Sequence, residues 1–209
     1  MSQIFLKEIE VVKTKVINLS TLVEENLYRA VSSVESKSSS LALEVIEKDK
    51  AIDAEETRLE EEILKVLALH QPLATDLRYL ITILKVNDEL ERIGDLAVNV
   101  AERTQALVEV KSIEMPFDFN TMSQRVCEML KKSIDALVHL NRDRAVEVFS
   151  LDDEVDEIHS NMYKLFKAGI VENIDDLDAL SNYLSISKHL ERIADHAENI
   201  AEDILYLID

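Results

Sequence analysis

Apolar residues recur every three or four positions through most of the chain, the spacing that places them on one face of an α-helix. The first such run predicts a helix over residues 3–35. The polar cluster at 36–40 then supplies turn and N-cap residues, and a second amphipathic run continues to His70. Pro72 ends that run and suits the first turn of a third helix, expected from about residue 73 to about 108.

The second half of the chain follows the same plan. The segment VKSIEMPFDFN breaks the periodicity and is expected to connect the halves, while Gly169 and the polar stretch VENIDD mark the last turn. Three further helices are expected at about 118–140, 143–168 and 175–207. With only two glycines and two prolines, the predicted fold class is all-α.

One motif occurs twice, 100 positions apart. LERIGDLAVNVAE at 90–102 and LERIADHAENIAE at 190–202 share nine of thirteen residues. A repeat period of this length is one whole small bundle, which two copies of a three-helix unit explain more simply than a six-helix solenoid. The sequence therefore predicts two pseudo-symmetric three-helix bundles, residues 1–110 and 111–209.

The repeated motif carries acids spaced four residues apart, which lie on one side of a helix. The second and fifth predicted helices carry similar files of acids. The four files are Glu91, Asp95 and Glu102; Glu191, Asp195 and Glu202; Asp49, Asp53 and Glu56; and Asp152 and Asp156 followed by His159. Glu56, His159, Glu102 and Glu202 are the less secure members.

These files meet if each pair of neighbouring helices forms an antiparallel hairpin. A turn centred on Pro72 puts Asp53 opposite Glu91, and it also puts Asp49 opposite Asp95. In the second half, pairing Asp156 with Glu191 and Asp152 with Asp195 places the turn within residues 169–176, where the breakers stand. The same register thus aligns both pairs of files.

Carboxylates that face each other at close range repel, so they either splay into water or hold cations. In a chain with 31% charged residues a single such pair is ordinary solvated surface, but four files in two matching registers favour a metal site. Carboxylate ligands favour hard ions such as Mg²⁺, Ca²⁺, Mn²⁺ or Fe³⁺, and repeated files can bridge more than one ion. His159 softens the second site and admits Zn²⁺.

The charge balance and the motifs narrow the function. With 42 acids against 23 bases, the net charge of −19 disfavours nucleic acid as a partner. No nucleophile with a base at a recognisable spacing and no glycine-rich phosphate loop is present, so an enzyme is not expected. The single Cys127, the lack of a basic-then-apolar leader and the lack of a long apolar run predict a cytoplasmic protein with no membrane insertion.

The sequence resembles the PhoU family nearly from end to end, above all in the stretch QPLATDLRYLITILKVNDELERIGDLAVNVAE. The acid-x-x-x-Asp signature of that family appears as Glu91/Asp95 and Glu191/Asp195, with matching acids at Asp49/Asp53 and Asp152/Asp156. The resemblance implies a multinuclear metal cluster on each bundle and a negative regulator of the phosphate-starvation response. It also implies two partners, the ATPase subunit of the phosphate-specific ABC transporter and a phosphate-sensing histidine kinase. A homodimer is expected as well.

Two other functions remain open from the sequence. A ferritin-like di-iron carboxylate enzyme also places metal between helical carboxylates, but such sites use Glu-x-x-His on two helices. Here only Asp156 has a histidine three residues later, His159. An inert acidic scaffold is the third possibility, and it predicts that alanine at Glu91 and Asp95 leaves regulation unchanged.

Overall fold

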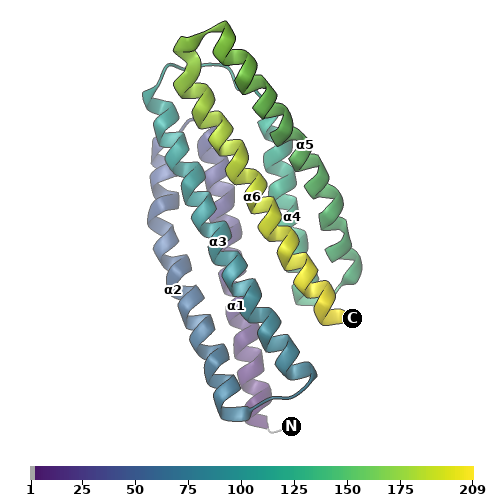
Figure 1. The fold of residues 1–209 in the computed structure, drawn as a ribbon. Coiled ribbons are helices and arrows are strands. Elements are labelled where there is room, and N and C mark those ends of the chain that lie inside the picture. The colour runs from purple at the N-terminus through teal and green to yellow at the C-terminus, as the bar shows by residue number, and fades with distance from the viewer. Residues whose placement is uncertain (1–2) are drawn as a thin grey trace.

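The chain folds into six long helices that run up and down one elongated bundle (Figure 1). The computed structural model describes residues 3–209, with residues 171 and 172 described in their backbone only. No strand occurs among these residues, which confirms the all-α prediction. The helices are α1 Gln3–Glu35, α2 Ser39–His70, α3 Thr75–Glu109, α4 Phe119–His139, α5 Arg142–Glu172 and α6 Leu177–Ile208, and a short 3₁₀ turn, η1 Ile174–Asp176, precedes α6.

Local side-chain chemistry explains where several helices begin. The side chains of Ser38, Asp118 and Asn141 each accept a hydrogen bond from a backbone N–H of the first turn of α2, α4 and α5, respectively. Helix α3 begins at Thr75 rather than beside Pro72, so the proline lies in the turn and not in the helix. The predicted boundaries otherwise agree with the structure to within a few residues.

Gly169 does not end its helix, contrary to the expectation from the sequence. Helix α5 continues through it to Glu172. A Cβ atom at this position would lie 2.7 Å from Cδ1 of Leu180 in α6, closer than real contacts allow. The glycine therefore leaves room for the Leu180 side chain near the turn between α5 and α6, and it does not act as a helix stop.

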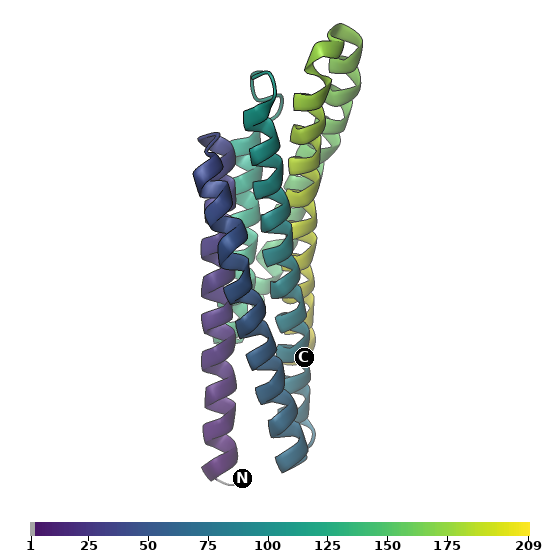
Figure 2. The same cartoon turned by 90° about the vertical axis from the view of Figure 1, so that its left-hand side faces the viewer.

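The two halves pack side by side and are shifted along the long axis. Helices α3 and α6 lie antiparallel at the centre, with α2 flanking α3 and α5 flanking α6, while α1 and α4 pack behind them (Figure 1). Figure 2 shows that α1–α3 extend past the second half at one end, whereas the α5–α6 turn extends past the first half at the other. Each end of the molecule consequently carries a step.

One hydrophobic core joins the two halves. Leu90 and Ile93 of the first LERI motif and Leu190 and Ile193 of the second are fully buried and belong to the same cluster. Burial of such side chains contributes about 1.5–3 kcal/mol each. The apolar residues of the repeated motif therefore form the centre of the bundle. The acids of the motif lie on the sides of α3 and α6 that face away from this core. The division at residue 110 stays a prediction.

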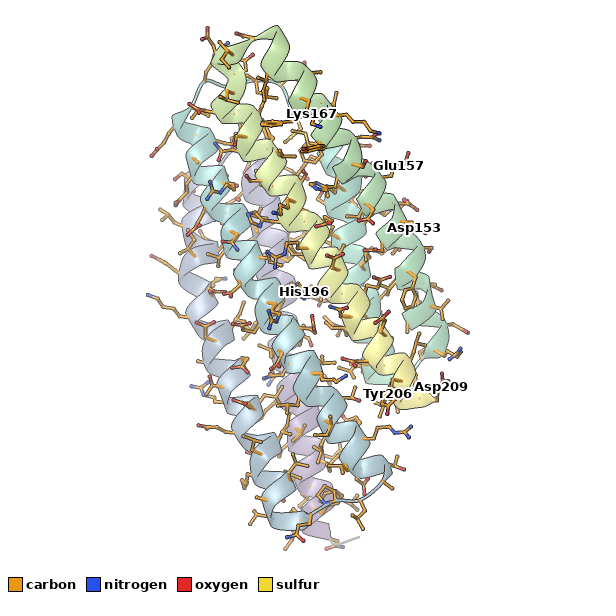
Figure 3. The ribbon with its side chains drawn as sticks, in the orientation of Figure 1. Asp153, Glu157, Lys167, His196, Tyr206 and Asp209 are labelled. Carbon is orange, nitrogen blue, oxygen red and sulfur yellow. The ribbon has the colours of Figure 1, made fainter. Side chains whose placement is uncertain are left out.

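Polar contacts add to this central seam. Lys85 of α3 pairs with Asp203 of α6 at 2.6 Å. His196 of α6 turns toward α3, where its Nδ1 lies 2.5 Å from Oε2 of Glu89 (Figure 3). None of the helices in the described part of the chain is long and apolar enough to span a membrane.

Candidate metal centres

Side-chain contacts define the register of both helical hairpins. In the first hairpin the Asn87 amide of α3 donates to Oε1 of Glu56 in α2 at 2.6 Å. In the second, Nδ1 of His159 in α5 lies 3.0 Å from the Ser187 hydroxyl of α6. The register predicted from the sequence places the residue after Asn87 opposite Glu56 and the residue after Ser187 opposite His159, so each observed contact is offset by one position. The register predicted from the sequence is therefore confirmed to within one residue in both halves.

The first acid cluster is formed by carboxylates of α2 and α3. Its members are Asp49, Asp53, Glu91 and Asp95. Burial, followed by the charges of the other three members, raises the pKa of Asp49 to about 6. Burial also raises the pKa of Glu91, with Asp95 as the next cause. Oδ1 of Asp49 is buried and has no hydrogen-bond partner. The charges of Asp53, Asp95 and Glu91 thus reach Asp49, and the metal site at these four acids stays a prediction.

The second acid cluster occupies the equivalent place between α5 and α6. Its members are Asp152, Asp156, Glu191, Asp195 and Glu198. Burial, then the charges of Glu198, Asp156 and Asp195, raise the pKa of Asp152 to about 7. The pKa values of Glu191 and Asp195 are raised in the same way, by burial first and by neighbouring acids second. Oδ1 of Asp152 is buried without a hydrogen-bond partner, like its counterpart in the first cluster.

The donor chemistry of both clusters fits a hard cation. A buried carboxylate oxygen without a donor costs roughly 1–3 kcal/mol, and the structure has one at the same place in each repeat. Coordination to a metal ion would satisfy this oxygen and offset the repulsion that raises the neighbouring pKa values. Within the described residues no three acidic, histidine or cysteine side chains converge tightly enough to hold an ion. Ion binding therefore requires a change of side-chain rotamers.

The sequence as a whole matches the family model of the PhoU domain twice. The two matches cover residues 16–104 and 119–204, which correspond to α1–α3 and α4–α6. The chain belongs to the PhoU family.

Members of the PhoU family resemble this chain over most of their length. A phosphate-specific transport system accessory protein PhoU homolog from Clostridium acetobutylicum is 30% identical over 99% of this chain and 94% of that protein. The crystal structure of PhoU from Pseudomonas aeruginosa superposes with a TM-score of 0.93 at 33% identity, covering 98% of each chain. The phosphate transport system regulatory protein PhoU from Streptococcus pneumoniae gives a TM-score of 0.85 at 29% identity, over 97% and 96% of the chains. These names describe accessory and regulatory proteins, not enzymes.

The less secure members of the files differ in their surroundings. The Glu56 carboxylate accepts a hydrogen bond from the Asn87 amide, and its negative charge helps to raise the pKa of Glu91. His159 is bound to Ser187, and burial lowers its pKa. Glu202 raises the pKa of Glu198, and so it lies at the margin of the second acid cluster. Glu102 is exposed and forms no hydrogen bond or ion pair with any described residue, because the register places it beside the start of α2, beyond the acid file.

Glu198 was missed by sequence reasoning. It is the first neighbouring charge, after burial, to raise the pKa of Asp152. The repeated motif points only to acids that occur in both of its copies, and the first copy has Val98 at the position of Glu198. The available signal was its position three residues after Asp195, which places the two carboxylates on one helical face. In this member of the PhoU family the second cluster therefore carries one more carboxylate than the first.

Gly94 lies against the first acid cluster and offers a test of it. A Cβ atom there would lie 3.2 Å from Cγ2 of Ile52 and 3.3 Å from Oδ1 of Asp49. We expect Gly94→Ala to displace the Asp49 carboxylate and to weaken metal binding by about tenfold, since one displaced ligand oxygen is worth roughly 1–2 kcal/mol. Titration calorimetry in an Asp152→Asn background, which disables the second cluster, measures this affinity. Ala194→Gly at the equivalent position is the matched control, and an unchanged affinity in Gly94→Ala would contradict the assignment of Asp49 as a ligand.

Proposed function

We propose that this chain is a non-enzymatic, metal-binding regulator of phosphate uptake that represses the phosphate-starvation response. In this proposal it works in the cytoplasm, the compartment expected for a chain with a single, partly buried Cys127. It couples the ATPase subunit of a phosphate-specific ABC transporter to a phosphate-sensing histidine kinase. Its relatives are named as accessory or regulatory proteins of phosphate transport, which supports the transport half of the proposal.

The metal half of the proposal assigns ligands to both clusters. Asp49, Asp53, Glu91 and Asp95 hold ions in the first cluster, and Asp152, Asp156, Glu191 and Asp195 hold them in the second, with Glu198 as an added ligand there. A bound ion supplies positive charge that draws facing carboxylates together. Hard ions such as iron, manganese or magnesium match these oxygen ligands, and zinc becomes an alternative if His159 leaves Ser187.

One observation carries the metal assignment. Two carboxylate oxygens, Oδ1 of Asp49 and Oδ1 of Asp152, are buried without a partner at matching positions of the two repeats. A solvated acidic face has no reason to bury such an atom, let alone twice. The buried orientation of these two oxygens instead suits coordination of a cation that binds each half in the same manner.

A genetic experiment tests the regulatory role. Deleting the gene is expected to activate a phosphate-starvation reporter in phosphate-rich medium, and the wild-type gene should restore repression. We expect the double variant Asp49→Asn, Asp152→Asn to leave the reporter active at wild-type protein levels, because both clusters lose a central ligand. Glu44→Gln, at an exposed position of α2 outside the clusters, should repress normally. Full repression by the double variant would show that repression does not need the acid clusters, and a silent reporter after deletion would refute the regulator and favour an inert scaffold.

A further inference from the structure

A groove lies at the step where α1 and α3 extend past the second half (Figure 2). We call it the basal groove. It has a volume of about 590 Å³ and is lined by Phe5, Leu6 and Ile9 of α1, Tyr79 of α3, Leu140 of the α4–α5 turn and Ile208 of α6. A smaller pocket of about 130 Å³ shares Tyr79 and Leu140 with it and extends it toward Val138. The basal groove is therefore long, mostly apolar and shared by both halves of the molecule.

Leu140 is held in the groove at a conformational cost. Its φ is 46° and its ψ is 48°, the left-handed conformation that glycine adopts without penalty and leucine does not. Its side chain is nevertheless 51% exposed, so burial within the molecule does not account for a leucine here. An apolar side chain kept in a strained conformation and half exposed is more readily explained by a contact with another molecule.

The opposite end of the molecule shows the equivalent elements in a covered state. Lys37 directly precedes the N-cap Ser38 of α2, as Leu140 directly precedes the N-cap Asn141 of α5, and Lys37 also has a positive φ of 48°. The 100-residue offset of the repeated motif places Asp176, at the start of α6, in the position of Asp76, which lines the basal groove. Each end thus offers a turn residue at positive φ and an aspartate at the start of the central helix.

At that end the connection between the halves, residues 110–118, lies over both elements. Nζ of Lys37 donates to Oγ of Ser112 at 2.8 Å, and Lys111 pairs with Asp176 at 2.7 Å. The connection contains no helix or strand, and three of its apolar residues occupy alternate positions. Ile113, Met115 and Phe117 pack against the core. The covered end is therefore filled by a non-helical segment that supplies alternating apolar side chains to the core and a lysine to the aspartate.

The basal groove has no such cover within the described chain. Glu10 at its rim is neutralised by Lys13 at 2.8 Å, but no described residue forms an ion pair or hydrogen bond with Asp76. A second copy of this chain is a poor occupant, since each copy carries a net charge of −19. A cationic occupant has the complementary charge.

We propose that the basal groove binds an extended segment of a partner protein that has apolar side chains at alternate positions and a lysine or arginine facing Asp76. The apolar side chains lie against Leu140, Tyr79 and Ile9, and the basic group pairs with Asp76 as Lys111 pairs with Asp176. The inference rests on the proposed function only in that a regulator requires a partner. Binding to the purified protein can fail while the regulatory phenotype persists, so the two proposals can be refuted separately.

A labelled peptide tests this inference. The probe copies residues 110–118 with Glu114→Lys and Asp118→Lys, and its binding to the full-length chain is followed by fluorescence anisotropy in about 150 mM salt, which screens non-specific attraction. We expect saturable binding that Leu140→Gly weakens about tenfold, because the buried area of one leucine is lost. Asp76→Asn should weaken it several-fold through loss of the ion pair. Glycine suits the backbone at 140, so Leu140→Gly should keep or raise the melting temperature.

Controls separate this outcome from its competitors. Asp143→Asn removes another exposed acid from a first helical turn, and Leu43→Ala removes another half-exposed leucine, so both should bind the peptide normally. A scrambled peptide of the same composition should bind at least tenfold more weakly. Equal binding of the scrambled peptide, or equal losses in all variants, would reduce the effect to net charge and overturn the proposal. So would a dimeric wild type that Leu140→Gly converts to a monomer in light scattering, because the groove would then be occupied by a second copy.

Discussion

Adding Mn²⁺ or Fe²⁺ to the metal-free protein at pH about 7.5 is expected to raise its melting temperature by about 10–20 °C. An ion that binds only the folded state contributes about 2.7 kcal/mol at a concentration 100 times its Kd. Two clusters double this to about 5 kcal/mol, and each kcal/mol shifts the melting temperature of a chain of this size by about 2–4 °C. Differential scanning calorimetry of chelator-treated protein, with and without added ion, measures the shift.

The variants of this experiment locate the ions. Asp49→Asn and Asp152→Asn should each remove about half of the metal-induced shift, and the double variant should remove nearly all of it. Glu44→Gln should retain the full shift, as it changes the same net charge outside the clusters. If NaCl at equal ionic strength reproduces the shift, the effect is screening of the −19 charge and not coordination. Elemental analysis of protein purified without chelator then gives the resident ion directly.

The helices and their pairing could be predicted because each signal is local and long. Six amphipathic runs of 21 to 35 residues define the helix boundaries, and short turns leave one antiparallel register for each hairpin. The contact of Glu56 with Asn87 confirms this register in the first half. The error at Gly169 shows the limit, since the side chain that fills the space beside that glycine, Leu180, comes from the next helix. No pattern along one helix contains such information.

The candidate site was predictable where it repeats and unpredictable where it does not. Asp49 and Asp152 were found because they occupy matching files, whereas Glu198 has no counterpart and was passed over. The contact of Glu89 with His196 joins helices from different halves, so its register depends on how the bundles pack. The basal groove shares this dependence. Its walls come from α1, α3, α6 and the α4–α5 turn, which meet only through the axial shift between the halves.

Lowering the pH of the metal-free protein from about 8 to about 5.5 is expected to stabilise it through the two central aspartates. The pKa of Asp152 is raised to about 7 and that of Asp49 to about 6, from an ordinary value of 3.8. A raised pKa in the folded state means that folded protein takes up the proton first. The stability from each protonated group is complete below the unfolded value and is lost as the pH rises through the folded value. The metal-free protein should therefore lose stability as the pH rises from about 4 to about 7.

The variant Asp152→Asn isolates this contribution. It removes the charge that the cluster repels, so at pH 8 it should stabilise the metal-free protein by about 1–2 kcal/mol once solvent screening of this half-exposed group is allowed for. The gain should shrink as the pH falls below about 7, and it should vanish only below about pH 4, where Asp152 is protonated in the unfolded state as well. Urea unfolding of both proteins across this range gives the difference curve, in which the contributions of all unchanged groups cancel. Asp143→Asn should give a flat difference curve.

A flat curve for Asp152→Asn as well would mean that its carboxylate does not face the other acids, and the second cluster would then lose its central ligand. Opposite signs for one substitution, stabilising without metal and destabilising with it, are what distinguish a metal ligand from a solvated surface acid.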